Sequence, residues 1–242
     1  MKTKVFFLMI LFATTVFAAN AQDKEVQGTS KLMRTDGITH IKSNTSTHFM
    51  WVSYGIDGIL TNGGAGTYTA KDGKYTETLA TTARLQYVGA QAIYDYKVEG
   101  KKITVSGFIE KEGEKLMAVN EVREKIDASE VDIETNVQGS WKLVNEEMAA
   151  NGITHTKLIT STHFMWVLYG PNGLLINGGA GTYTAKDGKY TETLAANPNP
   201  LFVGAKAVYD YKVEGDKMTT IGFIEKDGVK LMEINEVWEK VD

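Results

Sequence analysis

One stretch of 19 residues, NGGAGTYTAKDGKYTETLA, occurs twice in this chain without a change, at 62–80 and at 177–195. The repeat extends beyond it, because residues 37–127 align with 152–242 without a gap and 64 of the 91 aligned pairs are identical. A unit of this length is the size of a small domain and too long for a solenoid repeat. The chain therefore consists of two copies of one domain. Since the identity runs through turns as well as apolar positions, it does not by itself mark a functional site.

A shared opening motif sets the limits of the two copies. VQGTSKL (26–32) in the first copy corresponds to VQGSWKL (137–143) in the second, which carries four extra residues near 146–150. We therefore expect one domain at 26–127 and a second at 137–242. The polar and acidic residues 128–136 are expected to form the linker between them.

The first 21 residues have the pattern of a secretory signal peptide. Two lysines precede an apolar run over 5–19, and Ala19-Asn20-Ala21 matches the small-x-small cleavage pattern. We expect residues 1–21 to be removed, leaving an exported protein, periplasmic or extracellular, with no integral membrane segment. An uncleaved N-terminal anchor is the alternative.

Composition excludes several classes of function. The chain contains no cysteine, which excludes disulfides, thiolate catalysis and a lipoprotein anchored through cysteine. A hydrophobic content of 43% and a net charge of −4 are typical of a globular protein. Without a basic stripe, we expect no nucleic-acid partner.

Short runs of β-branched and aromatic residues between turn residues predict strands throughout both copies. In the second copy the predicted strands include 140–145, 154–160 and 163–169, and predicted hairpins turn at 187–188, 214–216 and 227–228. No segment has a convincing helical period, although 146–151 could form one turn. Eight to nine short strands per copy predict an all-β fold of two tandem antiparallel up-and-down β-barrels, which leave no exposed sheet edge.

Two tryptophans distinguish the copies. Trp141 in the first predicted strand of copy 2 and Trp238 in its last are Ser30 and Arg123 in copy 1. If the first and last strands pair to close the barrel, these positions are neighbours and would change together. Coincidence is the alternative explanation.

The segment QGSWKLV (138–144) is similar to the Gly-x-Trp opening of lipocalin-type barrels, and NEVWEKV (235–241) is similar to the closing strand of exported bacterial lipocalin-like proteins of uncharacterised function. The order THFMWV, GTYT, KYTET, VGAKAVYDYKVEGDKM and EVWEKV resembles that group over nearly all of each copy. The resemblance implies a calycin-like barrel that binds small apolar or amphipathic molecules. It brings no catalytic constellation and no cofactor. Copy 1 departs from the pattern at Ser30 and Arg123.

The segment HFMWVLY (163–169) is apolar at every position, whereas a strand with one solvated face should alternate. It therefore predicts a strand buried on both faces, with its own barrel on one side and the sister domain on the other. The alternative is a short strand with one apolar residue facing outward. The Gly-rich NGGAG (177–181) lacks the features of a phosphate-binding loop and precedes a strand, which favours a bulge or tight turn.

Aromatic residues are dense, and several are spaced to share a strand face. A barrel lined by tyrosines and one carboxylate would suit an amphipathic ligand, although these residues could also be ordinary strand-forming aromatics. The candidate ligand-binding residues are Trp51, Tyr54, Tyr68, Tyr75, Glu77, Tyr94 and Tyr96 in copy 1, and Trp166, Tyr169, Tyr183, Tyr190, Glu192, Tyr209 and Tyr211 in copy 2.

Each copy has two histidines eight residues apart, without the close pairing typical of metal ligands, so we expect no metal site. A histidine beside a buried glutamate could act as an acid–base pair. The candidate pairs are His48 with Glu77 and His163 with Glu192.

Three functions remain open at this point. The first is an exported, non-enzymatic binding protein for a small amphipathic or aromatic ligand. The second is a calycin-fold enzyme that uses these His–Glu pairs. The third is an interaction module whose two filled barrels increase avidity for a protein partner.

Overall fold

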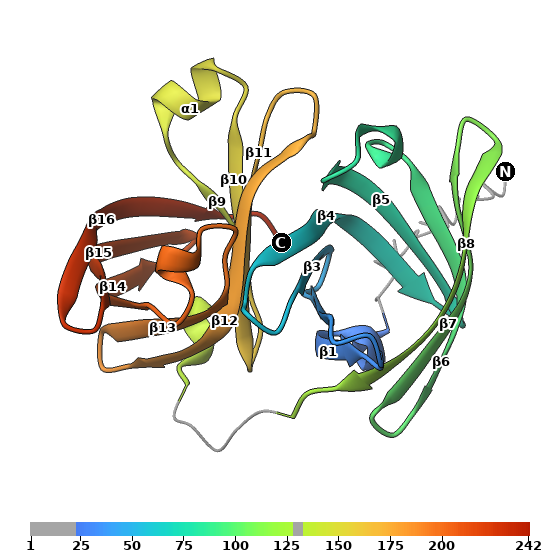
Figure 1. The fold of residues 1–242 in the computed structure, drawn as a ribbon, viewed down its shortest axis with the longest axis horizontal. Coiled ribbons are helices and arrows are strands. Elements are labelled where there is room, and N and C mark those ends of the chain that lie inside the picture. The colour runs from blue at the N-terminus through green and yellow to red at the C-terminus, as the bar shows by residue number, and fades with distance from the viewer. Residues whose placement is uncertain (1–22, 128–132) are drawn as a thin grey trace, which may run out of the picture.

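A computed structural model of the chain describes residues 23–127 and 133–242. It contains two closed barrels of eight antiparallel strands, which lie side by side (Figure 1). Neighbouring strands in each barrel follow one another in chain order, so the prediction of two tandem up-and-down barrels is confirmed. The predicted signal peptide, 1–21, and residues 128–132 of the predicted linker lie outside the described residues.

Barrel 1 consists of β1 (Gly28–Leu32), β2 (Thr39–Asn44), β3 (His48–Tyr54), β4 (Leu60–Lys71), β5 (Lys74–Thr82), β6 (Gln91–Glu99), β7 (Lys102–Lys111) and β8 (Glu114–Lys125). Barrel 2 consists of β9 (Gly139–Leu143), β10 (Thr154–Ile159), β11 (His163–Tyr169), β12 (Leu175–Lys186), β13 (Lys189–Ala196), β14 (Lys206–Glu214), β15 (Lys217–Lys226) and β16 (Val229–Lys240). Short 3₁₀ helices precede each barrel, η1 (Lys24–Val26) and η3 (Thr135–Val137), and interrupt each one, η2 (Leu85–Tyr87) and η4 (Pro200–Phe202).

The extra residues of copy 2 form its one α-helix, α1 (Glu146–Ala150). Asn145 caps this helix, because its side chain accepts a hydrogen bond from the Met148 backbone N–H at 2.9 Å. The single turn expected near 146–151 is thus confirmed. Among the described residues, no helix is long and apolar enough to cross a membrane.

Barrel closure depends on pairing between the first and last strands. β1 pairs with β8, and β9 pairs with β16, both antiparallel. In barrel 2 this pairing aligns Trp141 with Lys240 and Leu143 with Trp238, so the two tryptophans are diagonal neighbours. Both are fully buried in one hydrophobic cluster. The prediction that they lie together at the closing seam is confirmed.

The repeated NGGAG segment is shaped by close approach of the backbone. The pairing of β4 with β5 shifts register between Ala65 and Gly66, as expected for a bulge. A Cβ atom on Gly66 would lie 1.9 Å from the Thr78 carbonyl oxygen, and one on Gly64 would lie 2.9 Å from the Trp51 indole nitrogen. These glycines therefore serve the fold, as the sequence predicted.

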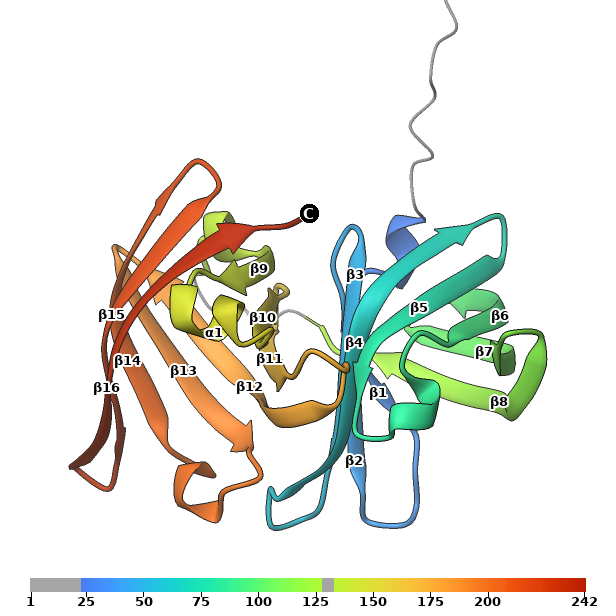
Figure 2. The same cartoon turned by 90° about the horizontal axis from the view of Figure 1, so that it is seen from above.

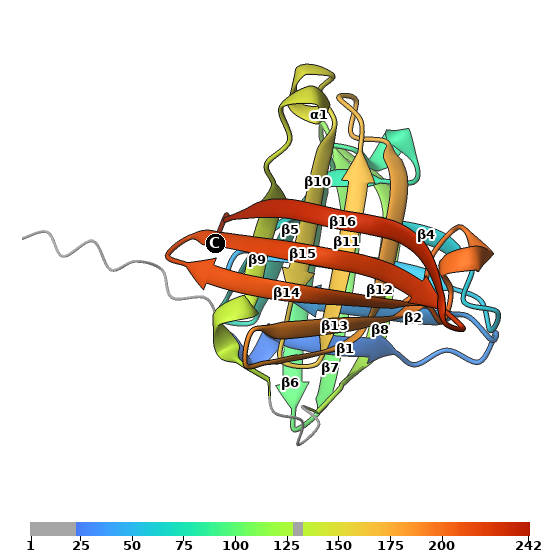
Figure 3. The same cartoon turned by 90° about the vertical axis from the view of Figure 1, so that its left-hand side faces the viewer.

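The two barrels pack through the outer faces of β2–β4 and β10–β12, which meet at the centre of the molecule (Figures 1 and 2). Met50 and Val52 of β3 and Met165 and Val167 of β11 are fully buried in this interface. The alternate residues of β3 and β11 face their own barrel cores. Strand 163–169 is therefore buried on both faces, as predicted. β13–β16 lie on the side of barrel 2 away from barrel 1, which faces the viewer in Figure 3.

Paired hydrogen bonds give the interface two-fold character. Thr29 bonds Thr160 through their hydroxyls at 2.7 Å, and Thr45 bonds Ser140 in the same way at 2.7 Å. Thr29 corresponds to Ser140 and Thr45 to Thr160 in the repeat, so each bond maps onto the other. The two copies therefore meet as a symmetric dimer would, through the same patch on each.

Candidate functional site

Strand β2 carries the polar residues of barrel 1 on alternate positions. His40, Lys42 and Asn44 line an internal cavity, while Ile41 between them packs in the inter-barrel cluster. This is the period of two that a strand imposes on its side chains. The sequence analysis did not predict this inward-facing polar row, although three polar side chains at i, i+2 and i+4 indicate one face of a strand.

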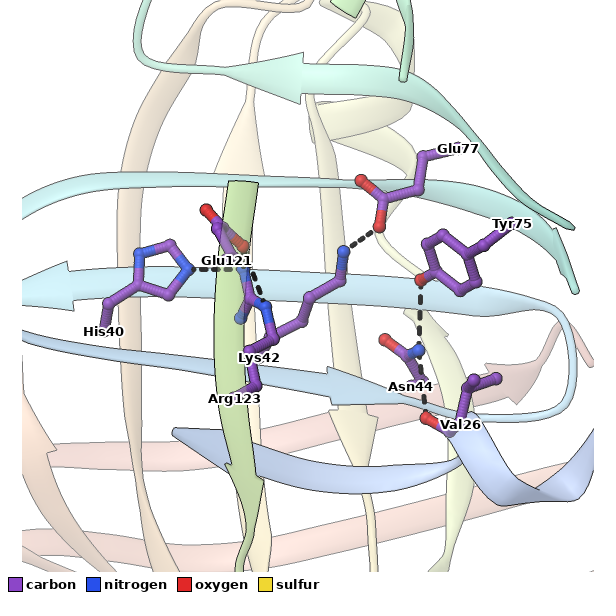
Figure 4. Close-up of polar contacts among 8 residues, drawn as sticks. All are labelled: Val26, His40, Lys42, Asn44, Tyr75, Glu77, Glu121 and Arg123. Carbon is purple, nitrogen blue, oxygen red and sulfur yellow. Dashed lines mark hydrogen bonds and ion pairs between the residues drawn. The ribbon is translucent and has the colours of Figure 1, made fainter. Parts of the chain in front are cut away.

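A buried lysine–glutamate ion pair crosses the interior of each barrel. Lys42 pairs with Glu77 in barrel 1 (Figure 4), and Lys157 Nζ lies 2.8 Å from Glu192 Oε1 in barrel 2. Burial lowers the pKa of Lys42 well below its ordinary value, and the nearby Arg123 lowers it further. Each glutamate is thus paired with a lysine from the preceding hairpin. Neither lysine had been identified from the sequence.

Arg123 organises the second polar group of barrel 1 (Figure 4). Its Nε donates to Glu121 Oε2 at 2.9 Å, and its Nη2 lies 3.2 Å from His40 Nε2. Since Arg is only a donor, His40 accepts at Nε2 and donates from Nδ1 to Ser53 Oγ, 2.8 Å away. Burial, with the charges of Arg123, Lys42 and Arg34, lowers the pKa of His40 to about 2, so this imidazole is neutral at neutral pH.

The other end of barrel 1 lies under η1. The Val26 carbonyl accepts a hydrogen bond from Asn44 Nδ2 at 3.1 Å, and the same amide nitrogen lies 3.0 Å from the Tyr75 hydroxyl (Figure 4). Val26 itself is buried against the barrel core. A buried carbonyl needs such a donor, which fixes η1 to the barrel.

In barrel 2, two tryptophans supply the hydrogen bonds that Asn44 and Arg123 donate in barrel 1. Trp141 Nε1 donates to the Val137 carbonyl of η3 at 2.8 Å, which replaces the bond from Asn44. Trp238 Nε1 donates to Glu236 Oε2 at 3.2 Å, in place of Arg123. His155 contacts the Trp238 ring edge to face, with centroids 4.9 Å apart. Burial lowers the pKa of His155 to about 3 and raises that of Glu236.

Both barrels contain a cavity, but the two reach different depths. The cavity of barrel 1 has a volume of about 280 Å³ and extends from Arg34 and His40 to Val26 under η1. That of barrel 2 has a volume of about 250 Å³, and Val137, Trp141, Ile159 and Tyr190 are not among its lining residues. The Trp141 side chain fills the space beneath η3 that Ser30 leaves open in barrel 1.

The structure places the predicted ligand-binding residues in two groups. Trp51, Tyr75, Glu77, Tyr94 and Tyr96 line the cavity of barrel 1, and Trp166, Glu192 and Tyr209 line that of barrel 2. The remaining candidates lie in three other places. Tyr54 and Tyr169 pack at the inter-barrel interface. Tyr68 and Tyr183 donate their hydroxyls to the Thr45 and Thr160 carbonyls. Tyr190 and Tyr211 belong to the core that Trp141 fills.

The candidate His–Glu pairs are not brought together. His48 lies at the start of β3, with Nδ1 2.7 Å from Thr47 Oγ1, and His163 lies at the start of β11, with Nδ1 2.9 Å from Thr162 Oγ1. Neither lines the cavity that contains Glu77 or Glu192. Across 23–127 and 133–242, no group of three or more His, Asp or Glu side chains could hold a metal ion.

Comparison with known proteins gives no family for this chain. No family model matches it, and no curated protein does. Among solved structures it is similar to the Helicobacter pylori beta clamp bound to a DNA ligase peptide, at 8% identity and a TM-score of 0.14, over 91% of this chain and 60% of that chain. It is also similar to the Thermotoga maritima DNA polymerase III beta subunit, at 9% identity and a TM-score of 0.13, over 93% and 81%. The chain thus spans less than two thirds of that first protein, and scores this low carry no argument.

Proposed function

We propose that this protein binds a small amphipathic or aromatic molecule inside a β-barrel. The observation that carries the proposal is the cavity of barrel 1, about 280 Å³ in volume, which combines apolar walls with fixed polar groups. Leu79, Ile103, Val105 and Val119 line it together with the Arg123 group. Binding sites for small molecules have this composition.

The size of the cavity limits the ligand. Pockets for drug-sized molecules occupy roughly 300–1,000 Å³, so a cavity of about 280 Å³ suits a smaller molecule, such as a single ring system or a short chain. Its presence supports ligand binding over an interaction module with filled barrels. Tyr75 and Tyr94 stack with ring centroids 6.0 Å apart and give the ligand an aromatic wall.

We further propose that the protein is exported through the signal peptide at 1–21 and acts in the periplasm or outside the cell. The charged start, the apolar run and the Ala19-Asn20-Ala21 pattern support this location. The resemblance of both copies to exported lipocalin-like proteins supports it as well.

Native mass spectrometry of the two-barrel chain, purified without denaturation, tests the binding proposal. We expect excess mass that disappears when the protein is unfolded. The matched variant Ser30→Trp/Asn44→Ile gives barrel 1 the side chains that fill barrel 2, so it should lose this mass. A clean mass for the wild type, together with no binding of small amphipathic probes, would contradict the proposal.

A further inference from the structure

We propose that barrel 1 selects a ligand with a carboxylate group, held by the Arg123 guanidinium, and that barrel 2 does not. This inference rests on the proposed binding function and names the ligand class of one of its two cavities. Three observations support it: a hydrogen-bond donor in barrel 1 without a partner, the charges of the side chains that line the cavity, and the presence of Trp238 in barrel 2 at the position of Arg123.

The unused donor is Nη1 of Arg123. The residue is 7% exposed and lines the cavity. Its Nε and Nη2 are engaged by Glu121 and His40, but Nη1 is buried and has no hydrogen-bond partner within 23–127 and 133–242. Buried polar groups are nearly always satisfied, so an orphaned guanidinium nitrogen facing a cavity indicates a missing acceptor.

A carboxylate satisfies this donor best. Its bond to a guanidinium is charge-assisted and about twice as strong as a bond between neutral groups. The other buried charges do not oppose it, because Glu77 pairs with Lys42 and the lining carries three cationic side chains against two acidic ones. Arg34, which also lines the cavity, adds positive potential, although it is partly exposed and paired with Asp36. A doubly charged phosphate would need further free donors.

The cavity also fixes the orientation of such a ligand. Two other buried polar atoms of the lining have no hydrogen-bond partner in the described chain. Glu77 Oε1 is in an ion pair with Lys42, and Oδ1 of Asn44, near η1, is an acceptor. An anionic group would be repelled there. We therefore place the carboxylate at Arg123 and the apolar part of the ligand toward Tyr75 and the aliphatic side chains of β7.

Barrel 2 lacks this site although it keeps most of the surrounding residues. Lys157 with Glu192, Glu236 and His155 are all retained. Trp238 replaces the guanidinium by a single indole N–H, which is already bonded to Glu236. The cavity is lined by one cationic and two acidic side chains, against three and two in barrel 1. An added carboxylate would therefore meet a net negative lining.

Calorimetric titration of the two-barrel chain with 1-naphthylacetate and with its neutral amide, 1-naphthylacetamide, tests the inference. The two probes share an aromatic body and differ in charge. We expect the wild type to bind the carboxylate at least about tenfold more tightly, as expected for a hydrogen bond to a charged group.

Variants assign that preference to Arg123. In Arg123→Gln/Glu121→Gln, which removes both charges together, the carboxylate should lose its advantage, so that the affinities for the two probes agree within about twofold. Arg123→Lys should retain part of the preference, and the matched barrel 2 variant Glu236→Gln should leave it unchanged. Circular dichroism verifies that each variant is folded.

The possible failures are distinguishable. Equal affinity of the wild type for both probes would overturn the carboxylate inference and leave the binding function intact. A preference that survives in a folded Arg123→Gln/Glu121→Gln variant would also overturn it. If neither probe binds the wild type, the proposed function fails with it.

Discussion

The two barrels share one frame and differ in what they enclose. Both close through pairing of the first and last strands, carry the same glycine bulge and cross the interior with the same lysine–glutamate pair. The inward positions that differ include Ser30, Asn44 and Arg123 in barrel 1, against Trp141, Ile159 and Trp238 in barrel 2. A few side chains thus determine whether the space beneath the 3₁₀ helix is open or filled.

The exchanges also preserve the hydrogen bonds that the frame requires. The carbonyl of the capping 3₁₀ helix receives a donor from Asn44 in one barrel and from Trp141 in the other. The buried glutamate of the last strand receives one from Arg123 or from Trp238. These two acceptors keep a donor in both barrels. The exchange does not serve the histidine in the same way, because Arg123 contacts His40 Nε2, whereas His155 Nε2 has no hydrogen-bond partner among the described residues.

The largest effect on stability is expected from removing the filling of barrel 2. Trp141→Ala should lower the free energy of unfolding by about 4–5 kcal/mol, since it leaves a cavity and an unpaired carbonyl at Val137. Ser30→Ala at the matched position should change it by less than about 1 kcal/mol. Urea denaturation measures both, and similar losses for the two variants would contradict the contrast between filled and open barrels.

The buried ion pairs give the next effect. Lys157→Met leaves Glu192 uncompensated and should destabilise the protein by about 3–4 kcal/mol. Lys42→Met should do less damage, since its pair is the more exposed of the two, with side-chain exposures of 10% and 5% against 4% and 4%. Thermal and urea denaturation compare the two. Adding Glu192→Gln to Lys157→Met should restore much of the loss, and a double variant as unstable as the single one would contradict this account.

The buried histidines predict a loss of stability in acid. Their folded-state pKa values, about 2 for His40 and about 3 for His155, lie below the ordinary 6.5. The unfolded chain therefore binds more protons below pH 6.5, and stability falls as pH decreases from there toward the folded values. The slope should reach about 1.4 kcal/mol per pH unit for each histidine. Urea denaturation between pH 7 and pH 4 should show a shallower slope for His155→Gln, and an unchanged slope would count against a neutral buried imidazole.

The smallest effect tests the symmetry between the copies. Thr160→Val removes one interface hydroxyl and should lower stability by about 1 kcal/mol. Thr45→Val, at the equivalent position of barrel 1, should have the same effect, since its bond to Ser140 is the counterpart of the first. Thermal denaturation measures the stability of both variants. A large difference between their losses of stability would show that the two bonds do not contribute equally to the interface.

Much of this architecture could be predicted from the sequence. The repeat, the turn residues and strand spacing predicted two antiparallel barrels, and the all-apolar strand 163–169 predicted the contact between them. The cavity could be predicted only in part. Aromatic density identified Trp51, Tyr75 and Tyr94, but it also selected Tyr54, which packs at the inter-barrel interface, because strand spacing alone does not say which face points inward.

The residues that were missed are polar ones on an inward face. Lys42 and Lys157 are long charged side chains of a kind usually solvated, and only the closed barrel reveals that they meet Glu77 and Glu192. The sequence identified Trp141 as a difference between the copies, and only packing shows that its side chain fills space that is open in barrel 1. Contacts between strands distant in the sequence decide such questions, and strand periodicity does not contain them.

The most direct test of the difference between the barrels uses the four tryptophans as reporters. Trp51 is the one tryptophan of barrel 1, while Trp141, Trp166 and Trp238 belong to barrel 2. Two-dimensional ¹⁵N–¹H NMR resolves their indole N–H signals during titration with 1-naphthylacetate. We predict that the Trp51 signal shifts and saturates while the signals of Trp141 and Trp238 stay in place. Saturating shifts at Trp141 and Trp238, with Trp51 unmoved, would contradict the account.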